Sequence, residues 1–240
     1  MKKEIARFFM AAWILGVVLT GCDRIQVVND KAITTETSTI EPDGATSARV
    51  QIFMGAGELS LEGGAKNLME SSFSFNAEAF RPTVSYNVSD GVGKLVVSQD
   101  TESLPTGLQL VNQWTIALND SIPIELEIET GVGENNLDLS TLNVMKTHVE
   151  TGVGEVNINM NGEWSHDITV SVKGGVGAIS IKLPKKMGVQ VKVTSGLRGV
   201  TADGLALNGD TYTNDSFGES PQALYLQIEA GVGAIELVAR

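Results

Sequence analysis

The sequence predicts an all-β protein built as a stacked β-repeat solenoid with glycine corners, and three observations carry this prediction. A Gly-X-Gly centre recurs along the chain. Apolar residues alternate with polar residues on both sides of each centre, which is typical of strands with one buried face. The parity of the alternation switches at the centre, so the chain inserts one residue or bends there. Each unit should therefore be a strand, a glycine corner and a second strand.

The corner positions are read directly from the repeated centres. The predicted corner glycines are Gly55, Gly57, Gly91, Gly93, Gly131, Gly133, Gly152, Gly154, Gly175, Gly177, Gly231 and Gly233. A degenerate centre is Gly196-Leu197-Arg198-Gly199. Glycine suits a corner because it reaches positive φ without a Cβ clash and lets backbones approach closely. The residue between the two glycines is expected to lie on the inside of the corner.

The spacing of the centres indicates the size of one coil. From Val132 to Leu197 the centres are 21, 23 and 21 residues apart, and steps of about twenty residues suit one solenoid coil each. Longer steps elsewhere leave room for coils without glycines. The candidates are Met69 to Asn76, Val111 to Leu118 and Leu205 to Thr213. A β-sandwich made of the same strands is the alternative.

The first 21 residues predict a secretion signal. Lys2, Lys3 and Arg7 precede an apolar run from Phe8 to Thr20, whose 13 residues are too few to span a bilayer comfortably. Leu-Thr-Gly-Cys, ending at Cys22, then resembles the lipobox of bacterial lipoproteins. The resemblance implies that the signal is cleaved, that Cys22 is lipidated and that the chain is anchored to the extracytoplasmic face of a bacterial membrane. As the single cysteine of the chain, Cys22 has no partner for an internal disulfide or a redox pair.

Residues 22–47 are predicted to be a tether and residues 48–240 the β-repeat domain. The tether segment is rich in Thr, Ser, Asp and Glu and contains few apolar side chains that a core could bury. From Ala48 onward the alternation is continuous.

Three stretches of the repeat domain resemble a known family. They are Phe53 to Leu59, Glu127 to Gly133 and Val149 to Val156. The chain resembles the toast-rack domain family of bacterial envelope proteins, which is similar to the C-terminal domain of LiaF-type envelope-stress regulators and to domains named as β-repeat adhesins. The resemblance extends from about Ala48 to Arg240, and it implies a stacked β-repeat fold without an assigned enzymatic activity.

The chemistry-bearing residues favour no catalytic or metal site and no cofactor. Ser165, His166 and Asp167 are neighbours in sequence, so on a strand they would face alternate sides and could not form a relay; we expect a turn. His148 and His166 are the two histidines, too few for a typical zinc site without cysteines. Six aromatic residues are expected to fill the core or plug coil ends rather than form a sugar-stacking platform: Phe73, Phe75, Phe80, Tyr86, Trp114 and Trp164.

Charge excludes two classes of partner. The formal net charge is −12, and removal of residues 1–21 leaves 14 basic and 28 acidic residues, or −14. Nucleic acid and anionic lipid surfaces are therefore not expected as electrostatic partners. Glu134 and Glu155 take equivalent places in successive coils, as do Glu129 and Glu150. These acidic rows are either a solvated face relieved by Lys173 or a weak site for divalent cations or a cationic peptide.

These observations predict a non-enzymatic lipoprotein that acts in the envelope as a binding, scaffold or stress-related protein. Its partners would be the membrane, through the lipid on Cys22, and an envelope protein, peptide or glycan. A cell-surface adhesin is one alternative, and a polysaccharide-cleaving β-helix enzyme is another. We expect the last coil in the sequence, ending at Arg240, to lie at the open end of the stack and to be available for a second copy. At the other end, the segment near Ala48 is expected to cover the stack.

Overall fold

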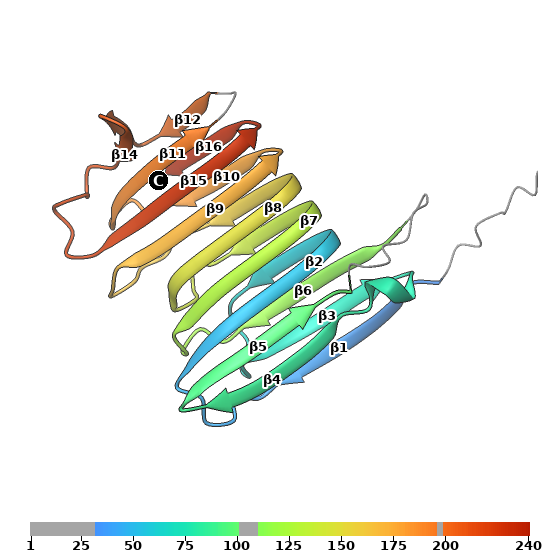
Figure 1. The fold of residues 1–240 in the computed structure, drawn as a ribbon. Coiled ribbons are helices and arrows are strands. Elements are labelled where there is room, and N and C mark those ends of the chain that lie inside the picture. Colours follow the sequence, from blue (N-terminus) through green and yellow to red (C-terminus); the bar gives the residue numbers. More distant parts are fainter. Residues whose placement is uncertain (1–31, 101–109, 196–198) are drawn as a thin grey trace, which may run out of the picture. The chain divides into compact units, whose positions relative to one another are not determined.

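The computed structural model describes residues 32–100, 110–195 and 199–240. Sixteen strands of one continuous sheet and one short 3-10 turn account for its regular structure (Figure 1). The elements are β1 (Thr34–Ile40), β2 (Ser47–Glu62), β3 (Met69–Phe75), η1 (Glu78–Phe80), β4 (Thr83–Ser89), β5 (Val92–Ser98), β6 (Asn112–Leu118), β7 (Ile124–Asp138), β8 (Val144–Asn159), β9 (Ile168–Val176), β10 (Ile179–Leu183), β11 (Gly188–Ser195), β12 (Val200–Asp203), β13 (Ala206–Asn208), β14 (Thr211–Thr213), β15 (Ala223–Val232) and β16 (Ile235–Ala239). In the described part of the chain, no helix has the length and apolarity to cross a membrane.

The strands stack in parallel coils that bend at the glycine corners. β2, β7 and β8 run unbroken through their corners, and β7 and β8 are paired from Ile124 to Asp138 of β7. Before the corner, the halves of these strands pair side by side, and β9, β15 and β11 follow β8 in the same sheet. We call this part of the sheet, before the corners, the first half-sheet. The halves after the corner continue into β10, β16 and β12, the second half-sheet. This confirms the predicted all-β stack; a β-sandwich would pair most neighbouring strands antiparallel.

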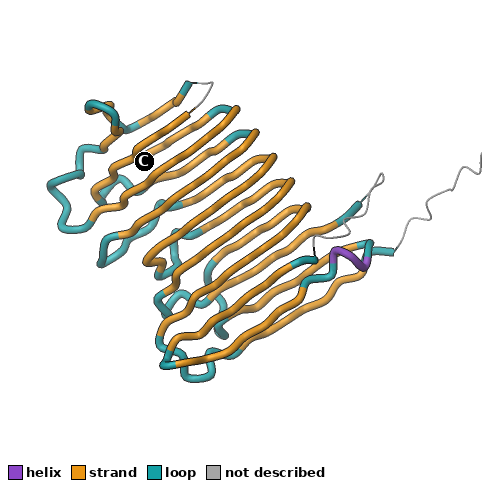
Figure 2. The backbone as a smooth tube through the Cα atoms, in the orientation of Figure 1, coloured by secondary structure: helices purple, strands orange, loops and turns teal. Residues whose placement is uncertain are grey.

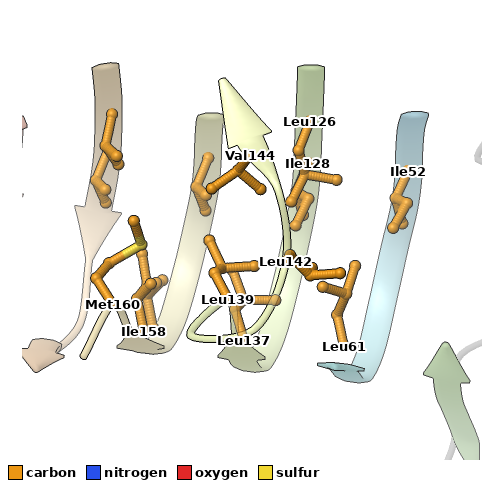
Figure 3. Close-up of a cluster of buried hydrophobic side chains, with 14 of the residues drawn as sticks. Ile52, Leu61, Leu126, Ile128, Leu137, Leu139, Leu142, Val144, Ile158 and Met160 are labelled. Atoms are coloured by element: carbon orange, nitrogen blue, oxygen red, sulfur yellow. The ribbon is translucent and has the colours of Figure 1, made fainter. Parts of the chain in front are cut away.

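A single layered core lies between the two half-sheets. Ile52 of β2 and Ile128 of β7 lie before their corners, and Leu61 and Leu137 lie after them (Figure 3). In the turn that joins β7 to β8, Leu142 is also fully buried and closes the coil on the side opposite the corner. The period-2 alternation thus buries one face of each strand, as the sequence predicts.

The order of the coils in space differs from their order in the sequence. β15 lies between β9 and β11, and β16 lies between β10 and β12 (Figure 1). The prediction that the last coil of the sequence lies at the open end is therefore wrong. Its strands are paired on both sides, because the segment from β12 through the β13–β14 hairpin carries the chain back to an inner position. The end of the stack is formed by β11, β12 and this hairpin.

At the other end, β5 and β6 still pair in parallel with β2, and the antiparallel strands outside them close the stack (Figure 2). β5 and β6 lie outside β2, followed by β4 in the first half-sheet and by β3 and β1 in the second. Ala48 belongs to β2 and is buried inside the stack, so the prediction that its segment covers the end is wrong.

The predicted tether is also wrong for Thr34–Ile40, which pairs with the whole of β3. Its β-branched threonines suit a strand, and its backbone covers an edge that would otherwise be open. Cys22 and the signal lie outside the described residues.

One predicted corner is instead a hairpin turn. Asp90 and Gly91 have φ of 53° and 77°, and Ser89 is paired with Val92, so β4 and β5 form a two-residue hairpin. Asp-Gly favours such a turn because both positions need positive φ. The prediction of a corner at Gly91 and Gly93 is therefore wrong. Of the three segments predicted to hide coils, Val111 to Leu118 supplies the parallel strand β6, whereas the other two form antiparallel strands.

Aromatic residues plug the end of the stack near β1. Phe73 and Trp114 are buried, with ring centroids 5.5 Å apart in an edge-to-face arrangement. The indole N–H of Trp114 donates to Asn112 Oδ1 at 2.9 Å, and Asn112 Nδ2 donates to the Ala56 carbonyl at 2.5 Å. With 1% of its surface exposed, Trp114 offers no stacking platform for a sugar. Trp164 is half-buried, and its N–H donates to the Leu142 carbonyl.

Candidate interaction surfaces

Two columns of stacked glycines build the corners of the described coils. Gly133, Gly154 and Gly177 lie one above another, with φ between 145° and 148°. A Cβ on any of them would overlap the carbonyl oxygen of the glycine in the coil before it. Gly131 and Gly152 belong to a parallel column in which an added Cβ would also collide with a neighbouring carbonyl. Stacking at the corners therefore requires glycine at both places.

The valines between the glycines point outward. Val132, Val153, Val176 and Val232 are in register on neighbouring strands, and 54%, 48%, 51% and 42% of their surfaces are exposed. We call this row the valine ridge; Ala56 continues it on β2. The prediction that the central residues lie inside the corner is wrong, because the bend leaves room inside for the residue two positions earlier. There, Thr130 and Thr151 are buried, and the hydroxyl of Thr130 donates to that of Thr151 at 3.2 Å.

Acidic residues lie on both sides of the valine ridge. Glu58, Glu134 and Glu155 form one row in register, two residues after the ridge. Glu58 accepts a hydrogen bond from the side-chain amide of Gln113, and Glu134 accepts one from that of Asn136, so both of these donors are neutral. The row three residues before the ridge is Glu129, Glu150, Lys173 and Glu229. Lys173 lies between two glutamates, as the solvated-face interpretation predicts. It reduces the repulsion between the carboxylates of this second row and not of the first.

Open hollows border the ridge where the glycines carry no side chain. One of about 690 Å³ is lined by Ala56, Gly57, Glu58, Phe80, Leu110, Val111, Asn112, Gln113, Val132, Gly133 and Glu134. We call it the corner groove. A second hollow of about 530 Å³ lies on the other side, with Glu150, Lys173 and Glu229 among its lining residues. The corner edge is therefore an apolar row between two partly acidic depressions.

The outer face of the second half-sheet carries a polar ladder. Asn157 Nδ2 donates to Asn136 Oδ1 at 3.0 Å, and Asn159 Nδ2 donates to Asp138 Oδ1 at 3.1 Å. These residues line a shallow hollow of about 520 Å³ together with Ser60 and other polar residues. Because in-register amides pair with each other across coils, much of their hydrogen-bonding capacity is used within the stack.

Asp138 gives this ladder a pH dependence. Partial burial alone would raise its pKa, but hydrogen bonds from the Ser140 hydroxyl and backbone N–H and from Asn159, with the charge of Lys182, together hold the pKa below its usual value. A depressed pKa in the folded state stabilises the fold above the unfolded-state pKa of about 3.9, and this stability is lost as the pH falls through the folded pKa.

We therefore expect Asp138→Asn to lower the melting temperature at pH 7 and to lose this effect in acid. The measurement is thermal unfolding of both proteins from pH 7 down to pH values below the folded pKa. Lys182→Gln, which removes one of the stabilising charges, should show a smaller difference in the same direction. A difference between wild type and Asp138→Asn that stays constant across this range would contradict the assignment.

The residues considered for catalysis do not converge. Ser165 and His166 form a bend, and Asp167 lies between this bend and β9. His166 Nε2 lies 3.0 Å from the Val144 carbonyl, whereas Asp167 accepts a hydrogen bond from the Ala223 N–H, so the two side chains serve different neighbours. The described residues contain no group of three or more His, Cys, Asp or Glu side chains placed to hold a metal ion.

Comparison with known proteins decides the family. The family described as "N-terminal domain of toast_rack, DUF2154" matches residues 28–182. The chain belongs to the toast-rack family. Its resemblance to that family, inferred above from the repeated corners, is thereby confirmed. No curated protein matches the chain.

Two solved structures are similar to the chain to very different degrees. A putative cell adhesion protein from Clostridium sporogenes ATCC 15579 is 33% identical, with a TM-score of 0.85 over 87% of this chain and 100% of that chain. This toast-rack chain therefore matches the whole of that structure. A putative adhesin from Bacteroides fragilis NCTC 9343 is 11% identical with a TM-score of 0.23, over 87% of this chain and 98% of that one. At this level of superposition the second protein supports no argument about the present chain.

Proposed function

We propose that the chain is a lipid-anchored protein of the bacterial cell envelope that binds a surface partner through the outside of its β-stack, as an adhesion or scaffold protein. The observation that carries the proposal is the match over its whole length of a structure named a putative cell adhesion protein. The exposed repeating edges and faces of the stack support it, because repeat folds commonly bind through such extended surfaces. The enzyme alternative receives no support from the two histidines of the described residues: His166 and Asp167 bind different backbone groups, and His148 Nε2 lies 3.7 Å from a carboxylate oxygen of Glu150 in a half-exposed ion pair.

The anchor rests on the sequence around Cys22. We expect the protein, expressed in its native host with an alkyne-bearing fatty acid in the medium, to acquire the label and to sediment with membranes. Cys22→Ala should lose the label. Ser47→Ala, which leaves the lipobox intact, is the matched control and should keep it. A labelled Cys22→Ala protein, or an unlabelled wild type, would contradict lipidation at this residue.

Binding is tested separately from anchoring. The full-length protein and its Cys22→Ala variant are crosslinked in intact cells and recovered through a C-terminal tag. The proposal expects a partner, near stoichiometric with the wild type, and its loss when the variant is no longer held at the membrane. Turnover of envelope polysaccharides by the purified protein, without a stoichiometric partner, would overturn the proposal in favour of an enzyme.

A further inference from the structure

The valine ridge is an unpartnered apolar row on the described surface. Its four valines lie on neighbouring strands with about half of each side chain exposed. Strands in a sheet are about 4.8 Å apart, so the row from Ala56 to Val232 is about 19 Å long. The glycine columns on both sides carry no side chains that could cover the valines. An apolar row in this setting is available to a partner.

The dimensions of the ridge match one side of a short helix. Apolar side chains on one face of an α-helix recur every turn, about 5.4 Å apart, and a helix of about 13 residues spans 19 Å. The ridge spacing of about 4.8 Å is close to this pitch. The corner groove lies beside the first part of the ridge and adds apolar residues, among them Leu110 and Phe80, to the glutamates in its lining.

The charges beside the ridge decide which helix fits. Glu58, Glu134 and Glu155 follow it on one side. The row that precedes it on the other side holds three glutamates and one lysine, so both rows are acidic overall: Glu129, Glu150, Lys173 and Glu229. A helix with Lys or Arg bordering its apolar side would place positive charge opposite both rows. An anionic lipid surface would meet the same carboxylates with the wrong sign.

A second copy of the chain fits poorly. Two ridges packed about a two-fold axis would bring the acidic rows of both copies together, and these rows would repel each other. In each copy, Lys173 is the one lysine in these rows. Four half-exposed valines also supply only a small part of the roughly 800 Å² per partner that a stable interface buries. The ridge is better suited to a short segment than to a dimer interface.

We propose that the valine ridge and its bordering glutamates bind a basic amphipathic helix of a partner polypeptide. The proposal rests on the binding function proposed above and names the chemistry of the partner. The valines bury the apolar side of the helix, and the glutamate rows attract the Lys or Arg residues that border it. Binding therefore combines a short-range apolar contact with an electrostatic attraction that salt weakens.

The test uses the full-length protein in nanodiscs of zwitterionic lipid, with empty nanodiscs as background. The probe is a fluorescent 14-residue Leu/Lys peptide with its leucines on one helical side, and anisotropy reports binding. A scrambled peptide of the same composition and a Leu/Glu peptide are the peptide controls. We expect the amphipathic Leu/Lys peptide to bind more tightly than both controls.

Variants assign the binding to the ridge. The triple variant Val132→Thr/Val153→Thr/Val176→Thr keeps the β-branched shape and should weaken binding about tenfold. Glu134→Gln/Glu155→Gln should weaken it about threefold at low salt and reduce its salt dependence. Glu62→Gln/Glu219→Gln removes the same net charge away from the ridge and should change affinity less than twofold. Circular dichroism and thermal unfolding check that each variant remains folded.

Two results would overturn the inference. One is equal binding of the Leu/Lys peptide and its controls, and the other is unchanged affinity in the folded triple variant. In either case the partner recovered by crosslinking in cells would still support the proposed binding function through another surface. If crosslinking in cells recovered no partner but the peptide still bound through the ridge, the proposed adhesion or scaffold role would be wrong. The helix-binding site on the ridge would still be supported.

Discussion

Replacing Gly154 by alanine is expected to cost more than about 4 kcal/mol of stability or to prevent folding. Gly154 has a φ of 145°, a conformation that residues with a Cβ rarely adopt, and the added Cβ would overlap the Gly133 carbonyl oxygen. Gly177 stacks on the other side in the same way, with its own added Cβ placed on the Gly154 carbonyl. The Gly154 backbone therefore cannot move away from one neighbour without disturbing the next. Urea and thermal unfolding measure the loss.

Two controls separate the causes of this loss. Val153→Ala changes the exposed neighbour at the same corner and should alter stability by less than about 0.5 kcal/mol. Gly209→Ala introduces a Cβ at a φ of 65° where no described atom lies within 4 Å, so it should cost about 1–2 kcal/mol for the backbone alone. If Gly154→Ala were no worse than Gly209→Ala, the close stacking of the corners would be wrong.

The structure of a single coil could be predicted from the sequence because the signals that specify it are local. Alternation of apolar residues sets which face of a strand is buried, and a parity switch at a glycine marks a bend. For β7 and β8 both signals agree, and the structure places their corners in register at Gly133 and Gly154. The plugging role of Phe73 and Trp114 also follows from composition, since large apolar residues fill the wider space at an end.

These signals could not predict whether the residue between the two corner glycines points inward or outward. Alternation extended through Ile128 and Thr130 points Val132 inward, yet the bend puts it outside. The outcome depends on the φ of Gly133 and on the space inside the corner, and neither is encoded in the period of the pattern. The valine ridge was missed for this reason. A tripeptide motif also cannot distinguish a corner from a hairpin, although Asp90 before Gly91 was the signal for a hairpin turn.

The spatial order of the coils was likewise not readable from the repeats. Every coil has similar edges, so the pattern of β15 and β16 fits an inner place as well as an outer one. What determines the position is the path of the connection after β12, and its residues show no period. The polar contacts that fix this path are visible only in three dimensions: Asn214 accepts a hydrogen bond from the Val189 N–H and donates to the Met187 carbonyl.

Deletion of residues 221–240 provides the test of this order, and we expect it to abolish cooperative folding of the C-terminal half of the stack. β15 and β16 pair with β9 and β10 on one side and with β11 and β12 on the other. Their removal takes away buried Leu224, Leu226, Ile228 and Leu237. Burying one such side chain stabilises a fold by about 1.5–3 kcal/mol, and the lost strand pairing adds to this. Circular dichroism and urea unfolding of the truncated protein measure the effect.

The matched control replaces the β13–β14 hairpin, residues 206–213, by a short Gly-Ser linker. Among the described strands, β11 is the one that pairs this hairpin with the stack, so removal of the hairpin should lower the melting temperature but leave one cooperative transition. A coil at the end of a solenoid can often be removed with a similarly limited loss, because each coil contacts only its neighbours. If the truncation at residue 220 were as mild as the loss of the hairpin, the last coil would have to lie at the end of the stack. A much larger effect of the truncation is the result that an inner coil requires.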